Sequence, residues 1–460
     1  MTLRVAVVGS GPAGFYAAGH LLASDLPVEV DMIERLPTPW GLVRLGVAPD
    51  HPKIKAVSKA FERIAAQPGF RFLGGVEVGR DLTHEDLAEL YDAVVYAVGA
   101  QTDRRMGIPG EDLPDSWAAT ELVAWYNGHP DYQELEFDLS GERAVVIGAG
   151  NVALDVVRML ALDPDEIRPT DTTDEAIEAI LGSGLKEIVL LARRGPAQAA
   201  FTTPELKELG ELADADVIVD PAELELDPAS EATLEHDTNA RRNVEVLRGF
   251  AARSPTGRRR AVRLRFCVSP VAILGEERVE AVDIVRNRLV SDDSGRVSAE
   301  PTDEHETIPC GIVFRSVGYL GVELPGVPFD SRRATIPNEN GRVTGVQGVY
   351  CAGWIKRGPS GVIGTNKKDA TETVDLLLED AHAGLLQRGD PAATAETVEQ
   401  RLADRGVDHV TYAGWEAIDV QERGRGEPQG RPRVKLLTWA ELLDAARSAS
   451  LTPTSSDPPG

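Results

Sequence analysis

The sequence predicts an α/β protein with two Rossmann-like dinucleotide-binding domains, one inserted into the other. Two glycine-rich turns, at residues 9–14 and 148–153, each follow a short strand of β-branched residues and precede a helix. Two further strands of similar design, 94–99 and 312–319, are expected to carry the chain between the domains. The expected ranges are 1–104 and 326–450 for the first domain and 105–325 for the second, with residues 451–460 as a disordered tail.

The first turn follows the strand Val5–Val8 and has the form G-x-G-x-x-G. Gly9 permits the tight turn, Gly11 lets the backbone approach a pyrophosphate, and Gly14 lets the helix pack closely on the strand. The helix N-terminus offers its N–H groups to the phosphates. The next strand ends in Glu34, where a carboxylate can accept both ribose hydroxyls of an adenosine. A glycine-rich turn in another kind of α/β protein, with a surface glutamate, is the alternative interpretation.

The second turn begins at Gly148 and has the form G-x-G-x-x-A. The strand after it, 186–191, is followed by Arg193 and Arg194 rather than by a carboxylate. Guanidinium groups at this position suit a ribose 2′-phosphate, which a carboxylate would repel. The first site therefore fits FAD and the second NADP(H), so that an NADP domain is inserted into a discontinuous FAD domain. The alternative interpretation of the two arginines is a solvated, charged strand end.

Two other segments have the composition expected beside a flat ring. The loop 36–55 contains four prolines, two glycines and a tryptophan, and Leu42 is a candidate ring contact. His51 lies near the end of this loop, where a structural or surface role is the alternative to a catalytic one. Later in the chain, Trp354 ends a strand and precedes a basic turn and a helix from Gly361. The N–H groups at that helix start could meet the ring oxygens of a flavin.

Composition excludes several classes of function. The chain has 460 residues with 48 basic and 74 acidic side chains, a formal net charge of −26, which argues against binding to nucleic acid or to an anionic membrane. Cys267, Cys310 and Cys351 form no C-x-x-C pair, so neither a redox dithiol nor a metal site is expected. We find no signal peptide or membrane span, which favours the cytoplasm.

One region is basic against this acidic background. It contains Arg241, Arg242, Arg258, Arg259 and Arg260. We expect this region to dock an acidic partner through electrostatic steering. A solvated loop and strand face is the alternative interpretation.

Together these stretches resemble the adrenodoxin reductase family of ferredoxin–NADP reductases, in its bacterial branch, over about residues 3–440. The motifs that carry the resemblance are GSGPAGFY (9–16), LPTPWGLVR (36–44), GVAPDHPK (46–53), GAGNVALD (148–155), ARRG (192–195) and GWIKRGPSGVIGTN (353–366). The resemblance implies FAD contacts at Ala13, Glu34, Leu42, Val78, Trp354, Gly361, Val362 and Ile363. It implies NADP contacts at Arg104, Ala149, Gly150, Asn151, Val152, Arg193, Arg194, Glu205 and Gly361.

In this family, a histidine matching His51 and a glutamate matching Glu208 lie together near the flavin, which makes these two residues the candidate catalytic pair. From the sequence alone, Glu205 and Glu208 share one face of a predicted helix, where complementing the helix dipole is the alternative role. The expected reaction passes a hydride from NADPH to FAD and then single electrons to a ferredoxin-type iron–sulfur protein, which could feed a cytochrome P450. The alternatives are an NADPH- and FAD-dependent monooxygenase or diaphorase, and a dinucleotide-binding sensor without catalytic activity.

Overall fold

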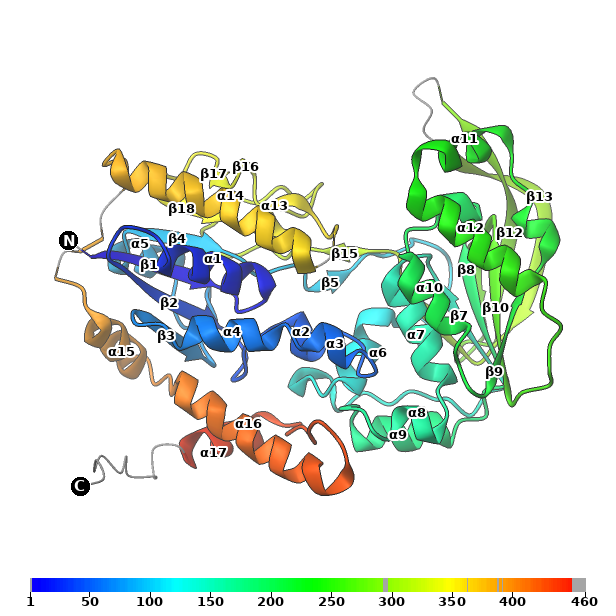
Figure 1. Ribbon diagram of the computed structural model, residues 1–460, viewed down its shortest axis with the longest axis horizontal. Helices are drawn as coiled ribbons and strands as arrows, with labels where there is room; N and C mark the ends of the chain where they lie inside the picture. The colour runs from blue at the N-terminus through cyan, green and yellow to red at the C-terminus, as the bar shows by residue number, and fades with distance from the viewer. Residues whose placement is uncertain (1, 293–296, 362, 387–388, 391, 449–460) are drawn as a thin grey trace. The chain divides into compact units, whose positions relative to one another are not determined.

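The computed structural model describes residues 2–292, 297–361, 363–386, 389–390 and 392–448, which form two compact units (Figure 1). Unit 1 comprises Met1–Val47, His51–Thr102 and Gly318–Gly460, and unit 2 comprises Ala48–Asp50 and Asp103–Val317. The chain leaves unit 1 after Thr102 and returns to it at Gly318, whereas the sequence places these transitions after residues 104 and 325. The expected tail, 451–460, lies outside the described residues.

Unit 1 is built on a seven-stranded sheet with the strand order β16-β17-β18-β4-β1-β2-β3. The last five of these strands are parallel neighbours, and β16 and β17 add an antiparallel edge. Val5, Ala6 and Val7 in β1 are completely buried, as expected for a strand that is covered on both faces. The strands are β1 Leu3–Val8, β2 Val28–Glu34, β3 Phe70–Gly74, β4 Ala93–Tyr96, β16 Asn338–Glu339, β17 Arg342–Val343 and β18 Val349–Cys351.

Helices α1 and α14 lie side by side against this sheet (Figure 1). Phe15 of α1 stacks on Phe61 of α4, with 4.8 Å between the ring centroids, so aromatic packing fixes the first helix in place. The helices of unit 1 are α1 Pro12–Leu22, α2 Leu42–Leu45, α3 Pro52–Lys55, α4 Ser58–Ala65, α5 His84–Leu90, α13 Trp354–Arg357, α14 Ile363–His382, α15 Ala395–Asp404, α16 Tyr412–Gly426 and α17 Trp439–Arg447.

Unit 2 is built on a six-stranded parallel sheet with the order β6-β14-β7-β8-β10-β9. Alternate residues of β7 and β8, such as Val146 and Leu190, pack in a core with α6, α7, α9, α10 and α12. Ala48 is completely buried in the same core. The elements are β6 Ser116–Ala118, α6 Ala119–Tyr126, β7 Arg143–Ile147, α7 Asn151–Ala161, α8 Pro164–Ile167, α9 Asp174–Leu181, β8 Glu187–Ala192, α10 Thr203–Leu209, β9 Ala215–Val219, α11 Pro228–His236, α12 Thr238–Ala251, β10 Arg260–Phe266 and β14 Ile312–Arg315.

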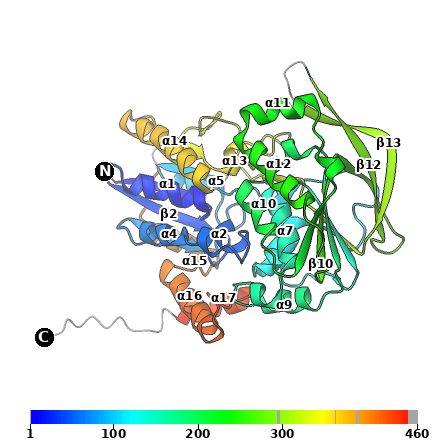
Figure 2. The same cartoon turned by 45° about the vertical axis from the view of Figure 1, so that its right-hand side comes forward.

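A second, antiparallel sheet in unit 2 consists of β11 Val268–Leu274, β12 Ala281–Ser291 and β13 Val297–Pro309. Figure 2 shows its two long strands, β12 and β13, side by side. Val145 and Val189, which point to the opposite face of the six-stranded sheet from Val146 and Leu190, pack in a separate core with Val282 of β12. This sheet therefore covers the face that the helices leave open.

The strand 94–99 lies wholly in unit 1 and does not cross between the domains as expected, whereas the segment 312–319 runs from unit 2 into unit 1 at Gly318. The first contributes β4 to the sheet of unit 1, and the second contributes β14 to the sheet of unit 2. The crossing segments are the short strands β5 Thr102–Asp103 and β15 Tyr319–Leu320, which pair with each other. The fold class is nevertheless confirmed, since each unit has a sheet of mainly or wholly parallel strands with a glycine-rich turn after one of its inner strands. Among the described residues, no helix combines the length and the apolar character needed to cross a membrane.

Candidate dinucleotide-binding sites

The glycine-rich turn of unit 1 leaves an open surface at the N-terminus of α1. A β-carbon on Gly9, whose φ is +102°, would lie 2.6 Å from the carbonyl oxygen of Ala97, and one on Gly14 would lie 1.9 Å from the carbonyl oxygen of Gly9. Gly11, the N-cap of α1, has no atom of another residue within 4 Å of that position. Gly9 and Gly14 are thus required by packing, while Gly11 leaves room for a pyrophosphate at the helix start.

Glu34 at the end of β2 braces this turn. Its carboxylate accepts hydrogen bonds from the backbone N–H of Ser10 (3.0 Å), the hydroxyl of Ser10 (2.6 Å) and the N–H of Leu36 (3.0 Å). A carboxylate can accept about four hydrogen bonds, so capacity for a ribose hydroxyl remains. The arrangement fits the adenosine end of FAD.

The proline-rich loop folds back onto the same turn. The backbone N–H of Trp40 donates to the carbonyl of Ser10 (3.0 Å). Trp40 has a φ of +83°, a backbone conformation that residues other than glycine rarely adopt. A β-carbon on Gly41 would lie 3.0 Å from the Cα of Gly11. Leu42, the next residue, is 42% exposed although it is large and apolar. An apolar side chain left open beside the turn is what a flavin contact requires.

The segment after β18 also reaches the start of α1. A β-carbon on Gly353 would lie 2.7 Å from the Cβ of Ala13, and the N–H of Gly353 donates to the Asp369 carboxylate at 2.5 Å. The indole N–H of Trp354 is buried without a hydrogen-bond partner among the described residues. Buried donors are rarely left unpaired, so this group fits a cofactor acceptor.

The other predicted FAD contacts are less informative. Val78 is 8% exposed and packs in the core of unit 1. Gly361 has a φ of +81° and precedes α14, which begins at Ile363. Val362 lies outside the described residues. These contacts stay predictions.

The glycine-rich turn of unit 2 repeats the design. A β-carbon on Gly148 would lie 2.2 Å from the carbonyl oxygen of Ser316, whereas Gly150, the N-cap of α7, faces open space. The side-chain oxygen of Asn151 accepts from the N–H of Thr202 (2.8 Å), and the carbonyl of Ala149 accepts from the N–H of Ala200 (2.8 Å). This turn, with the half-buried Val152 beside it, fits a second pyrophosphate.

Arg193 and Arg194 follow β8 at the same edge of the sheet. The N–H of Gly148 donates to the carbonyl of Leu191 in β8 (2.9 Å), which places the strand end beside the glycine-rich turn. Arg193 is exposed and Arg194 is half-buried, and Arg104 is exposed in the same unit. The guanidinium group of Arg193 is thus accessible to a 2′-phosphate, as the NADP assignment requires.

Sequence reasoning missed a buried arginine next to the predicted carboxylates of α10. The side chain of Arg158 is 4% exposed and contacts Asp50 (2.6 Å), Asp155 (2.8 Å), Glu205 (3.5 Å) and Glu208 (3.6 Å). Burial alone would lower the pKa of Arg158, but its bonds to Asp50 and Asp155 outweigh burial and raise it. The i,i+3 spacing of Asp155 and Arg158 was the only signal in the sequence.

His51 and Glu208, the candidate catalytic pair, belong to different units. His51 is the buried N-cap residue of α3 in unit 1. Glu205 and Glu208 lie one turn apart on α10 in unit 2, and each contacts Arg158 there. The roles of His51 and Glu208 in catalysis, and of Glu205 toward NADP, stay predictions.

The expected docking region is partly wrong. Arg260 is 2% exposed, and its guanidinium donates to the carbonyls of Leu160 (2.5 Å) and Ile180 (2.7 Å). These carbonyls belong to the last turns of α7 and α9, so Arg260 caps two helix C-termini. Arg258 and Arg259 each donate to a backbone carbonyl but are exposed, so docking at these two stays a prediction. Arg260 was misjudged because charge alone does not reveal which arginine of the run a strand start turns inward.

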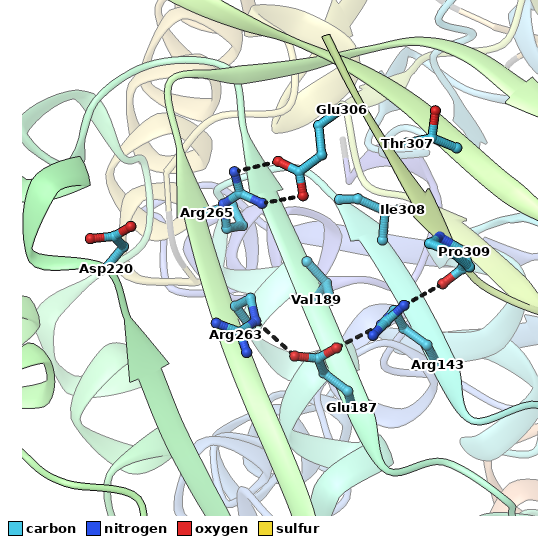
Figure 3. Close-up of a pocket in the computed structure, with 10 residues that line it drawn as sticks. All are labelled: Arg143, Glu187, Val189, Asp220, Arg263, Arg265, Glu306, Thr307, Ile308 and Pro309. Atoms are coloured by element: carbon cyan, nitrogen blue, oxygen red, sulfur yellow. Dashed lines mark hydrogen bonds and ion pairs between the residues drawn. The ribbon is translucent and has the colours of Figure 1, made fainter. Parts of the chain in front are cut away.

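Figure 3 shows a pocket of about 530 Å³ in unit 2. Glu187 joins Arg143 (2.6 Å) and Arg263 (2.7 Å), and Arg265 pairs with Glu306 (2.9 Å). Arg143 and Glu187 are the first residues of β7 and β8, whereas the glycine-rich turn follows the opposite end of β7. The pocket is therefore separate from the nucleotide site, and its charged groups compensate one another.

The three cysteines are all free. Burial raises the pKa of Cys267 to about 11 and the pKa values of Cys310 and Cys351 to about 12. Disulfide chemistry needs a thiolate, which these raised pKa values disfavour.

Comparisons with known proteins agree with this geometry. Residues 3–168 match the family model for pyridine nucleotide-disulphide oxidoreductases. The chain is 53% identical over 447 residues to NADPH-ferredoxin reductase FprA of Mycobacterium tuberculosis, covering 95% of this chain and 98% of the relative. It is 42% identical over 458 residues to the mitochondrial NADPH:adrenodoxin oxidoreductase of Salvelinus fontinalis, covering 97% and 91%.

A solved structure is similar along nearly the whole chain. The structure of M. tuberculosis FprA in complex with NADPH is 52% identical, has a TM-score of 0.93, and covers 97% of this chain and 100% of its own. The chain therefore belongs to the family of FprA-type NADPH–ferredoxin reductases, to which the adrenodoxin reductases are related.

Proposed function

We propose that this protein is an FAD-dependent NADPH–ferredoxin reductase. Hydride is taken from NADPH, and single electrons are delivered to a ferredoxin-type iron–sulfur protein that could feed a cytochrome P450. The observation that carries the proposal is the contrast between two otherwise similar sites. Glu34 lies at the end of the strand that follows the glycine-rich turn of unit 1, whereas Arg193 and Arg194 stand at the matching strand end in unit 2. The same chain therefore has one site that fits FAD and a second site that fits a 2′-phosphorylated dinucleotide.

FAD, when bound, supplies the conversion between two-electron and one-electron transfer. The chain supplies its placement. The turn at Gly11 receives the pyrophosphate, Glu34 accepts from the ribose, and the indole N–H of Trp354 donates to the cofactor. In unit 2, the turn at Gly150 receives the second pyrophosphate and Arg193 pairs with the 2′-phosphate. His51 and Glu208 would position the ring or the partner.

The first experiment measures the flavin spectrum of the purified protein and its NADPH-dependent reduction of candidate ferredoxins. A bound flavin with rapid ferredoxin reduction supports the proposal. Absence of flavin and of NADPH oxidation would favour a dinucleotide sensor. Stoichiometric oxygen consumption with a hydroxylated product would favour a monooxygenase, and reduction of dyes but of no ferredoxin would favour a diaphorase.

The second experiment tests the assignment of the NADP site. Arg193→Ala should weaken the use of NADPH but spare that of NADH, because only NADPH carries the 2′-phosphate. A charge-assisted contact is worth about 1.5–3 kcal/mol, or roughly ten- to a hundred-fold in kcat/KM. Arg168→Ala is the matched control, since Arg168 is an exposed arginine of the same unit paired with Glu178. Equal losses with both coenzymes would refute the assignment.

Docking of the iron–sulfur protein is proposed at four exposed arginines, Arg241 and Arg242 near the start of α12 and Arg258 and Arg259 just before β10. The double change Arg241→Ser and Arg242→Ser should slow the reduction of ferredoxin but not of ferricyanide, and the effect should shrink at high salt. Unchanged rates with both acceptors would remove these two arginines from the docking surface. A cytoplasmic location also stays a prediction.

A further inference from the structure

The turn that carries Arg193 and Arg194 is held by the three-stranded sheet of unit 2. The side-chain amide of Asn287, in β12, donates to the carbonyl of Arg193 at 2.8 Å. The N–H of Cys267, between β10 and β11, donates to the carbonyl of Arg194 at 3.1 Å. Two successive carbonyls are thus bound from one side, which restrains rotation of the turn.

Asn287 is well placed for this contact. It is 7% exposed, its N–H donates to the carbonyl of Cys267 at 2.7 Å, and its amide also donates to the hydroxyl of Ser269 at 2.8 Å. The pairing of β12 with β13 shifts register between Val285 and Asn287, and such irregularities re-aim side chains. Burying a polar side chain in a strand costs free energy unless the side chain is hydrogen-bonded. The Asn287 amide meets this requirement by bonding to the turn that carries Arg193.

Cys267 contributes through its backbone. It has a φ of +56°, a left-handed conformation that residues with a side chain rarely adopt. It is the single residue between β10 and β11, so the left-handed turn is where the chain leaves the six-stranded sheet for the three-stranded one. A β-carbon on Gly195 would lie 3.0 Å from Leu289 of β12, so the end of the turn also packs against this sheet.

We propose that Asn287 is a positioning residue for coenzyme selectivity, acting through the backbone of Arg193. The inference rests on the proposed NADP site. The turn at Gly148 holds the part of the dinucleotide that NADH and NADPH share, and it is braced separately by Ala200 and Thr202. Loosening the turn at Arg193 therefore weakens recognition of the 2′-phosphate and leaves the rest of the binding site intact.

The test is Asn287→Leu, which keeps the approximate volume, removes the donor and adds no charge near the phosphate. The dissociation constant for adenosine 2′,5′-bisphosphate, measured by calorimetry on the flavin-loaded protein, should rise about three- to ten-fold, as expected for one lost hydrogen bond. The KM for NADPH should rise by a similar factor, and the KM for NADH should not change. Ser269→Ala removes the other partner of the same amide and should leave all three values unchanged.

Arg193→Ala, measured in parallel, distinguishes a failure of the inference about Asn287 from a failure of the proposed NADP site. If Arg193→Ala loses the bisphosphate but Asn287→Leu binds it as the wild type does, the inference about Asn287 is wrong and the site assignment stands. If Arg193→Ala itself binds normally, the proposed site is wrong. Equal losses for NADPH and NADH in Asn287→Leu would also overturn the inference.

A second pair of variants tests the same brace if Asn287→Leu does not fold. Cys267→Gly suits the left-handed φ and should keep wild-type affinity for the bisphosphate. Cys267→Val should weaken it selectively, because a β-branched residue disfavours that conformation and the bond to Arg194 shifts with the backbone. Equal affinities in the two variants would overturn the role of the brace.

Discussion

Arg158→Met should destabilise unit 2 strongly. The substitution removes the guanidinium that Asp50, Asp155, Glu205 and Glu208 all contact. Breaking a buried ion pair by removing one partner costs about 3–5 kcal/mol. All four carboxylates keep some exposure to water, from 12% for Glu205 to 38% for Glu208, so we expect about 3 kcal/mol, at the low end of that range.

Differential scanning calorimetry of the flavin-loaded protein measures this effect, with flavin release as a separate marker for unit 1. For a domain of this size, 3 kcal/mol corresponds to a fall of roughly 6–12 °C in the melting temperature. Arg168→Met is the control, because its pair with Glu178 is exposed on both sides and 3.6 Å long, and such pairs contribute about 0–1 kcal/mol. A loss below 1 kcal/mol, or equal shifts in the two variants, would refute the view that Arg158 is the electrostatic centre of this cluster.

Three further outcomes are expected. Burial alone would raise the pKa of Glu422, but Arg44 and its neighbours lower it. Glu422→Gln should therefore reduce the free energy of unfolding above about pH 4.3, the pKa of a glutamate in the unfolded chain, and reduce it progressively less as the pH falls below that value. Melting curves of the variant and the wild type from pH 3 to 7 would test this. Arg260→Met should lower the melting temperature and leave ferredoxin reduction per folded flavin unchanged, whereas a selective loss of ferredoxin reduction would restore Arg260 to the docking surface. Gly14→Ala should abolish flavin retention, because its new carbon would lie 1.9 Å from the carbonyl of Gly9; a normal ratio of flavin to protein absorbance would contradict this.

The sequence predicted correctly the local structure around the candidate sites, because that structure depends on consecutive residues. A glycine-rich turn needs its strand before it and its helix after it, and both turns have this context. The position of Glu34 at the end of β2, and of Arg193 after β8, follows from strand length alone. Local order of this kind is visible without knowledge of the tertiary fold.

The parts that the sequence did not predict depend on distant partners. Arg260 is buried because carbonyls of the last turns of α7 and α9 accept hydrogen bonds from its guanidinium. No residue next to Arg260 in the sequence indicates that those helices end beside it. The Asn287 side chain reaches Arg193 from a strand whose register shifts beside it. Arg158 becomes a hub only when α10 and Asp50 reach it. Such contacts join residues far apart in the chain, where no periodic pattern connects them.

The short segment Ala48–Asp50 matters for any exchange of unit 2, the coenzyme unit, between related proteins, because it belongs to that unit. An exchange of residues 103–317 between relatives, cut at the two joints of the chain, would take Arg158 from one parent and Asp50 from the other. The 2.6 Å pair between them, and the seat of Ala48 in the core of unit 2, would then be assembled from parts that did not evolve together. A chimaera with altered coenzyme preference should therefore carry both segments, because the coenzyme unit is encoded in two pieces of sequence rather than one.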